Sequence, residues 1–320
     1  MQLSKLVFLQ PGLWKMLHNL SLRRMIVARE NVSLRRRGKS VRVSKQVWAG
    51  AIAVAALLAG VGREAGSMPA AHANESAPAA RANEIATTQL SPECAAQRPA
   101  YEGRRAFRRI HQALHERRAA RVLAIGSSSI VGVGASTSAA TFTEQLEADL
   151  ERVFKDADFD VIGRGMSGEV AAGTATRIRS EALQLKPDLI VWQVGTNDGV
   201  AKVDQAVFAA LLTTTLRWLA TYRYDVVLVD PQYVSKFATD EHYRAIVRII
   251  TEVARREHVP LVHRYGAMED LARRQINRSY MAGDLFHLND LGYKCMAEFA
   301  AQAIEAGVKQ AVAEGTLGAN

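Results

Sequence analysis

The sequence LIVWQV at residues 189–194 runs directly into GTNDG at residues 195–199. A short run in which nearly every residue is apolar is typical of a strand buried on both faces of a parallel sheet. Clusters of Gly, Asn and Asp end strands and form turns. The stretch therefore predicts a central strand that delivers polar side chains to one edge of a sheet.

Similar patterns extend outward from this strand in both directions along the chain. Further β-rich runs lie at residues 122–125, 159–162, 226–229 and 261–262. Apolar residues at helical spacing fill the intervals, at residues 141–154, 171–185, 205–222, 241–257 and 268–277. This alternation predicts one α/β domain over residues 105–310, with a parallel sheet covered by helices on both faces. Ligands of such sheets bind beyond the carboxyl ends of the strands, so reactive residues should follow the strands.

Two turns rich in small residues follow the first two predicted strands. The first, GSSS at residues 126–129, can present a hydroxyl without steric interference, and a helix N-terminus after it would stabilise negative charge. The second, GRGMSGE at residues 163–169, lets the backbone approach a ligand closely. Taken alone, a serine-rich turn usually caps a helix, and a glycine-rich turn is usually a flexible connection.

Polar residues also follow the third predicted strand and recur near the C-terminus. Asn197 can offer its side-chain NH₂ group to a developing oxyanion, although an Asx turn is the commoner use of this composition. Asp284 and His287 lie close together in the sequence, so the carboxylate can fix the tautomer of the imidazole ring. Metal binding is another use of such a pair, but no Cys/His cluster in the sequence supports a zinc site.

Taken together and in this order, the four segments resemble the four sequence blocks of the SGNH (GDSL-like) hydrolase superfamily. The resemblance implies a flavodoxin-like, three-layer α/β/α sandwich around a five-stranded parallel sheet. It implies that Ser128 is the nucleophile and that Asp284 and His287 complete a catalytic triad. It also implies an oxyanion hole formed by the N–H groups of Ser128 and Gly168 and by the side chain of Asn197.

The sequence departs from the family pattern at two positions within the resemblance, which spans residues 120–305. The first block usually reads Gly-Asp-Ser, and Ser127 stands here at the position of the aspartate. Register with the family selects Ser128 as the nucleophile over Ser127 and Ser129. Leu288 stands where a proline often follows the histidine, which should alter only the turn.

The resemblance predicts an enzyme, a serine ester hydrolase that forms an acyl-enzyme and needs no metal or organic cofactor. Neither the segment after residue 131 nor residues 230–240 resemble a long apolar lipase lid. This favours short acyl groups, such as acetyl on a small molecule or on an envelope or environmental polysaccharide. A lysophospholipase or thioesterase remains an alternative, as does an O-acyltransferase or a glycan-binding protein that uses the same pocket.

The net charge of +9 lies in the N-terminal leader rather than in the predicted domain. Residues 1–73 contain twelve Lys/Arg and two Glu, a net charge of +10, so the remaining residues carry −1. A basic patch for nucleic acid is therefore not expected on the domain, and the sequence predicts no nucleic-acid partner.

The leader has the layout of an export signal. A basic stretch that ends at Lys45 precedes an apolar run at residues 47–61, and residues 71–73 (Ala-His-Ala) provide a small-x-small cleavage site. We expect the protein to be exported, either to a periplasm or as a secreted protein. The apolar run could instead stay in the membrane as an anchor, and translation could begin at Met25.

The remaining segments are predicted as connections. Residues 74–104 are rich in Ala, Pro and polar residues and indicate a linker, and residues 311–320 indicate a tail. Apolar residues at helical spacing predict a helix over residues 101–121, with arginines on its solvated face. Cys94 and Cys295 could form a disulfide in an oxidising compartment or remain two free thiols.

Overall fold

A single six-stranded sheet organises the residues that the computed structural model describes, which are 87–95, 101–103 and 105–317. The strands are β1 (Tyr101–Glu102), β2 (Ala120–Gly126), β3 (Phe159–Gly165), β4 (Leu189–Gln193), β5 (Asp225–Val229) and β6 (Leu261–Val262). Five of them are parallel in the order β3-β2-β4-β5-β6, and β1 pairs with β6 in the antiparallel direction. The predicted five-stranded parallel sheet and its flavodoxin-like order are confirmed. Strand β1 is an addition that the sequence did not predict.

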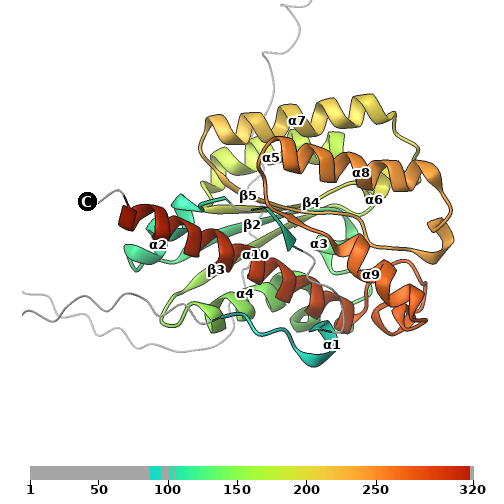
Figure 1. Ribbon diagram of the computed structural model, residues 1–320, viewed down its shortest axis with the longest axis horizontal. Helices are drawn as coiled ribbons and strands as arrows, with labels where there is room; N and C mark the ends of the chain where they lie inside the picture. The colour runs from blue at the N-terminus through green and yellow to red at the C-terminus, as the bar shows by residue number, and fades with distance from the viewer. Residues whose placement is uncertain (1–86, 96–100, 104, 318–320) are drawn as a thin grey trace, which may run out of the picture. The chain divides into compact units, whose positions relative to one another are not determined.

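Helices cover both faces of the sheet and form a three-layer α/β/α sandwich (Figure 1). One layer contains α2 (Arg108–His115), α4 (Phe142–Val153) and α10 (Asp290–Leu317), and the other contains α5 (Ala171–Leu185), α7 (Gln205–Thr221) and α8 (Glu241–Arg256). Alternate strand residues point to opposite layers, so Val191 packs into the core shared with α4 and α10, and Trp192 into the core shared with α7 and α8. Both side chains are fully buried.

Local sequence explains where the helices begin. Helices α7 and α8 follow Asp204 and Asp240, whose carboxylates accept hydrogen bonds from N–H groups of the first turn. The predicted bounds of α4, α5, α7 and α8 are confirmed to within one residue, whereas α9 begins four residues earlier than predicted. The shorter elements are α1 (Pro92–Ala95), α3 (Ser128–Val131), α6 (Thr196–Val200), α9 (Arg264–Arg273), η1 (Ser138–Ala140), η2 (Ser235–Phe237) and η3 (Asn277–Tyr280).

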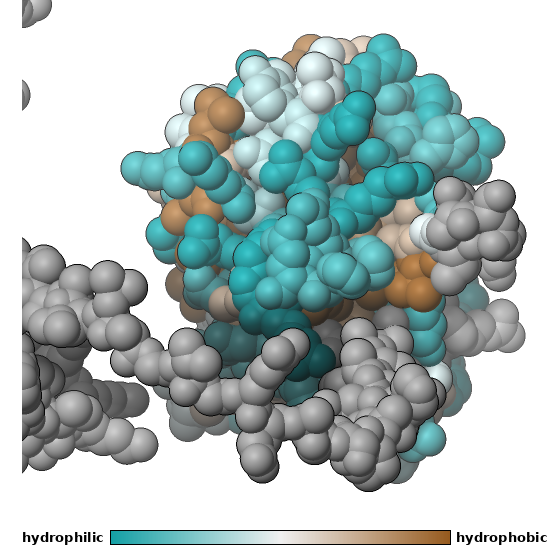
Figure 2. Space-filling view, turned by 90° about the vertical axis from the view of Figure 1, so that its left-hand side faces the viewer, coloured by the Kyte–Doolittle hydropathy of each residue, from teal (hydrophilic) through white to brown (hydrophobic). Residues whose placement is uncertain are grey.

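The helix predicted over residues 101–121 is shorter than expected. The observed helix, α2, spans eight residues. Several arginines of this region pair with acids around the amino ends of the strands. Arg118 forms two hydrogen bonds of 2.7 Å with Asp188, and Arg108 pairs with Glu314 at 2.7 Å. Figure 2 looks onto this end and shows a mostly hydrophilic surface. Arginines and acids at this end line a groove of about 790 Å³.

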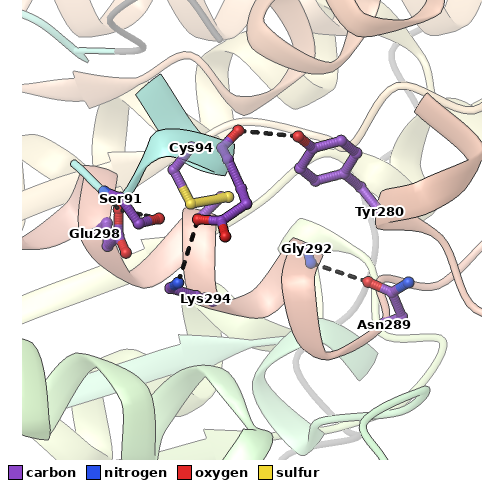
Figure 3. The surroundings of a disulfide bond; sticks show 9 residues. Ser91, Cys94, Tyr280, Asn289, Gly292, Lys294 and Glu298 are labelled. Atoms are coloured by element: carbon purple, nitrogen blue, oxygen red, sulfur yellow. Dashed lines mark hydrogen bonds and ion pairs between the residues drawn. A yellow bond between two sulfur atoms is a disulfide. The ribbon is translucent and has the colours of Figure 1, made fainter. Parts of the chain in front are cut away.

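A disulfide joins Cys94, in the short helix α1, to Cys295, in the first turns of α10 (Figure 3). Polar contacts surround it. The Tyr280 hydroxyl donates to Glu93 O at 2.9 Å, and Ser91 N donates to a Glu298 carboxylate oxygen at 2.8 Å. Of the two alternatives for Cys94 and Cys295, a disulfide or two free thiols, the structure therefore contains the disulfide.

These contacts correct the predicted linker over residues 74–104. Residues 87–95 pack on α10, where Thr88 N donates to Glu305 at 2.7 Å, and residues 101–102 form a strand of the sheet. We call residues 87–95 the arm. The sequence did not predict the arm because its anchors are a cysteine and backbone N–H groups, which leave no periodic apolar pattern. The predicted tail over residues 311–320 is also corrected, since α10 continues to residue 317.

The leader, with its predicted export signal and its apolar run at residues 47–61, lies outside the described residues. Among the helices that the structure does describe, none has the length and apolar character needed to cross a membrane.

We predict that the double substitution Cys94→Ala/Cys295→Ala lowers the free energy of unfolding by about 2–5 kcal/mol. The bond closes a loop between residues 201 positions apart, so its loss frees the unfolded chain and releases the arm from α10. Urea unfolding of the oxidised wild type and the variant measures the difference. Equal midpoints for the two proteins would contradict the prediction, and the reduced wild type should behave like the variant.

Candidate active site

Residues able to do chemistry gather at the carboxyl edge of the sheet, around its topological switch point. Strands β2 and β4 are neighbours in the sheet, but β3, which lies between them in the sequence, pairs on the other side of β2. The segments that follow β2 and β4 therefore diverge and leave a crevice, which is where ligands of open α/β sheets bind. Ser128 follows β2, Gly168 follows β3 and Asn197 follows β4.

Two segments far apart in the sequence bring a serine, a histidine and an aspartate into one hydrogen-bonded row. His287 Nε2 lies 3.2 Å from Ser128 Oγ, and His287 Nδ1 lies 2.6 Å from Asp284 Oδ2. The carboxylate favours a proton on Nδ1, which leaves Nε2 able to accept the serine proton. The structure thus brings the predicted triad together, and its catalytic role stays a prediction that substitution can test.

The hydroxyls of the three adjacent serines have different partners. Ser127 Oγ donates to Gln193 Oε1 at 2.9 Å, and Ser129 Oγ accepts a hydrogen bond of 3.1 Å from Arg264 Nη1. Only the Ser128 hydroxyl lies against His287. This geometry supports the choice of Ser128 that register with the family made.

A tight turn presents Asp284 and His287 together. Asp284 Oδ1 accepts hydrogen bonds from the N–H groups of Phe286 and His287, at 3.0 and 2.9 Å, and Leu285 adopts a left-handed conformation with φ of 55°. Burial alone would raise the pKa of Asp284, but the hydrogen bonds from His287 and from the two backbone N–H groups lower it to about 2. The carboxylate is therefore ionised at neutral pH. Leu288, at the position of the usual proline, is buried and pairs with Met281 across the base of the turn.

The predicted oxyanion donors lie on the other segments of the crevice. One N–H of the Asn197 amide donates to Glu169 O at 2.9 Å, which fixes the side chain and leaves its second N–H for a ligand. Gly168 has φ of 79°, and no atom lies within 4 Å of the place where its Cβ would be. Within the described residues, the N–H groups of Ser128 and Gly168 donate to no acceptor. These groups are therefore available to a bound oxyanion.

Asp198, next to Asn197, joins two of the segments that line the crevice. Its carboxylate oxygens lie 3.0 and 3.1 Å from the N–H nitrogen of Ala171, at the start of α5, and the residue is 2% exposed. Burial raises the pKa of Asp198 to about 6, against backbone hydrogen bonds that lower it.

A buried arginine beneath the serine turn was not anticipated from the sequence. Arg264 is 2% exposed, and its guanidinium donates to Asp230 O at 3.1 Å, Ser129 Oγ at 3.1 Å and Gln232 Oε1 at 2.9 Å. Burial lowers the pKa of Arg264, although the nearby Asp230 carboxylate raises it. A guanidinium keeps its proton in proteins, so a full positive charge is hydrogen-bonded to Ser129, the residue that follows Ser128 in the sequence.

Asp230 supplies the matching negative charge. It is fully buried, accepts a hydrogen bond of 2.8 Å from Tyr265 N, and lies 3.3 Å from His263 Nδ1. Burial raises the pKa of Asp230, and His263 and Arg264 oppose that rise. A signal for this cluster was present in the sequence, because Asp230 directly follows β5 and His263 and Arg264 directly follow β6. The rule that located the other site residues would therefore have located these.

No group of three or more His, Cys, Asp or Glu residues in the described part of the chain is placed to hold a metal ion.

A family model described as the Non-GDSL lipase-like family matches residues 93–310 of the chain. No curated protein matches the chain. One similar solved structure is a two-domain esterase active on acetylated mannans, with a TM-score of 0.56 and 18% identity over 67% of this chain and 57% of that one. The chain thus spans a little over half the length of that esterase.

Two further solved structures have TM-scores of 0.50. A lipase/acylhydrolase from Enterococcus faecalis is 20% identical, and the match covers 58% of this chain and 95% of that one. An acetyl-xylooligosaccharide esterase from Geobacillus is 19% identical, and the match covers 59% of this chain and 94% of that one. At these identities the likenesses show a shared fold.

We predict that Arg264→Met lowers the free energy of unfolding by about 3–5 kcal/mol, because it leaves the buried acceptors Asp230 O, Ser129 Oγ and Gln232 Oε1 without their donor. Guanidinium chloride unfolding measures the change. The matched control is Arg255→Met on the exposed surface of α8, which should change stability by less than about 0.5 kcal/mol. If the two substitutions changed the free energy of unfolding by similar amounts, the buried Arg264 guanidinium would not be needed for stability.

Asp198→Asn should change how stability depends on pH. A carboxyl whose pKa is higher in the folded state adds stability below its unfolded value, near pH 4, and that contribution is lost as pH rises through about 6. A difference of about two pKa units corresponds to about 3 kcal/mol. Relative to the asparagine variant, wild type should therefore lose about 3 kcal/mol between pH 4 and pH 7 in denaturant titrations. If the difference in free energy of unfolding between wild type and the variant were constant from pH 4 to pH 7, folding would not raise the pKa of Asp198.

Proposed function

We propose that the chain, which belongs to the Non-GDSL lipase-like family, is a serine ester hydrolase of the SGNH type that removes acetyl and other short acyl groups from carbohydrate. The observation that carries the proposal is the hydrogen-bonded row from Ser128 through His287 to Asp284. In this reading the reaction passes through an acyl-enzyme on Ser128.

The first half of the reaction transfers the acyl group to the enzyme. Ser128 Oγ attacks the ester carbonyl carbon while His287 Nε2 takes the hydroxyl proton, and Asp284 stabilises the imidazolium that forms. The carbon–oxygen bond to the alcohol then breaks, and His287 returns the proton to the departing alcohol. In the second half a water attacks the acyl-enzyme, His287 takes its proton, and the acid leaves as the proton returns to Ser128.

Charge on the carbonyl oxygen needs donors that are fixed before the reaction. The N–H groups of Ser128 and Gly168 and the second amide N–H of Asn197 are the three groups that fit this role. Because the Asn197 side chain is already held by Glu169 O, it would lose little freedom when the oxyanion forms. Loss of one such donor typically lowers turnover by about 10²–10³-fold.

Two observations support a short acyl group on a carbohydrate. The solved structures with similar folds include esterases active on acetylated mannans and acetyl-xylooligosaccharides. The loop that follows β5 is short and begins with the buried residues Gln232 and Val234, so it does not have the form of a long apolar lid over a long acyl chain.

Export completes the proposal. Its supports are the leader, with its basic stretch, apolar run and small-x-small site, and the Cys94–Cys295 disulfide, since such bonds persist in oxidising compartments. A polysaccharide of the envelope or the surroundings would be within reach of an exported enzyme.

The test is Ser128→Ala assayed with p-nitrophenyl esters of two to eight carbons. Wild type should release p-nitrophenol fastest from the acetate, and the variant should lose at least about 10³-fold of the turnover, since the nucleophile is gone. Circular dichroism should show an unchanged fold. The control Ser180→Ala removes an exposed hydroxyl on α5 and should keep wild-type turnover.

Full activity in the Ser128→Ala variant would show that Ser128 is not the nucleophile. Rates that rise with chain length would favour a lysophospholipase or thioesterase. With an acetylated glycan as donor and a second glycan as acceptor, free acetate identifies a hydrolase and an acetylated acceptor identifies an O-acyltransferase. Binding without either product identifies a glycan-binding protein.

A further inference from the structure

A cavity of about 720 Å³ lies beside the triad, and no step of the proposed mechanism uses it. Asp284 and Phe286 form part of its wall, and the Phe286 ring meets the His287 ring nearly at right angles, with ring centroids 4.9 Å apart. The volume is in the range of small-ligand sites. The part of a substrate that extends beyond the ester could therefore occupy this cavity.

Two cations line the cavity without a carboxylate of their own. Lys236 in η2 and Arg278 in η3 are exposed, and neither pairs with an acid in the described part of the chain. The arginine-lined groove at the other end differs in that carboxylates also line it, and two of them, Asp188 and Glu314, pair with Arg118 and Arg108.

The acid in the cavity wall does not neutralise these cations. Asp284 already binds His287 and accepts two backbone N–H groups, and no contact joins it to Lys236 or Arg278. The cavity therefore presents two unpaired positive charges near the triad, an arrangement that suits a negatively charged ligand.

The rest of the lining suits a sugar. Phe237 and Phe286 are half-buried in the cavity wall with ring centroids 6.4 Å apart, and one face of the Phe237 ring stacks on Tyr243. The C–H faces of a pyranose can pack on the ring surface that remains. Asn277 Nδ2 donates to Ser235 Oγ at 3.2 Å, which links the two turns that carry the cations. Both polar side chains lie on the cavity wall, where hydroxyl groups of a sugar could reach them.

We propose that this cavity binds a uronic acid residue, so that the natural substrate is an O-acetylated acidic glycan rather than a neutral one. The sugar ring packs on Phe237 and Phe286, and its carboxylate lies between Lys236 and Arg278. The inference rests on the proposed function for the ester, but the binding of the acidic sugar itself does not require catalysis.

The test is calorimetric binding of unacetylated tetragalacturonate and of neutral xylotetraose to the full chain. Wild type should bind the acidic tetramer at least about tenfold more tightly, and the affinity should fall as salt is raised. Lys236→Gln/Arg278→Gln should weaken binding of tetragalacturonate at least about tenfold. The matched control Arg117→Gln/Lys155→Gln removes two exposed cations at the amino edge of the sheet and should leave the affinity unchanged.

Equal affinity for the two tetramers would overturn the inference, as would equal losses in the two double variants. Hydrolysis of acetylated oligogalacturonate and acetylated xylo-oligosaccharide by wild type separates the two proposals. If neither ester is hydrolysed but the acidic tetramer binds through Lys236 and Arg278, the proposed function fails and the acidic subsite stands. If both esters are hydrolysed at equal rates without selective binding, the esterase stands and the acidic subsite fails.

Discussion

The direction of the strands determines where the chemistry of this molecule can lie. Five parallel strands end at one edge, and the order β3-β2-β4 turns the segments after β2 and β4 away from each other. Backbone N–H groups left free by the strands and by the short helices α3 and α6 therefore surround one crevice. Ser128, Gly168 and Asn197 each lie within four residues of a strand end. Only Asp284 and His287 come from elsewhere, and a turn closed by the Met281–Leu288 bridge brings them back to the same edge.

Beneath this edge, a buried polar network joins the segments to one another. Gln193 binds Ser127, Thr196 links Gln193 to Gln232, and Gln232 and Ser129 both bind Arg264. Gln232 also donates to Phe286 O, so the same network reaches the turn that carries the histidine. An isolated buried guanidinium would be costly, and its three oxygen acceptors together with the negative charge of the nearby Asp230 offset that cost. Because Ser127 and Ser129 are both held by this network, the hydroxyl between them is the one left free for His287.

A serine at position 127 suits the site, since its partner Gln193 Oε1 is an acceptor and an ionised aspartate there would have no proton to donate.

Most of the fold could be predicted because its signals are local. The parallel strands are short apolar runs, and Asp204 and Asp240 mark helix starts in the sequence itself, so their bounds were found closely. The site residues were predicted as a set from the resemblance of four ordered, individually weak motifs to the SGNH family, and register with that family selected Ser128; the structure brings Ser128, Asp284 and His287 together. Arg264 and Asp230 were missed although they follow strands, because a single sequence does not reveal which charged side chains are buried or which partners they have. The arm at residues 87–95 was missed for a related reason, since its anchoring acids, Glu298 and Glu305, lie more than 200 residues away. The cavity beside Phe286 joins three segments, and no one of them indicates it.

The arm has a structural part in the site that its composition conceals. Cys94 is bonded to Cys295, five residues after the start of α10, and the Tyr280 hydroxyl donates to the carbonyl of Glu93 (Figure 3). Tyr280 O in turn accepts from Asn289 N, so the contacts of the arm fall on both ends of the turn that presents Asp284 and His287. That turn contains a left-handed leucine and an exposed aspartate, and its hydrogen bonds are few and mostly its own. The disulfide, the Tyr280 contact and the start of α10 lie at the two ends of this turn, so the arm packs on the framework from which the turn carrying Asp284 and His287 extends.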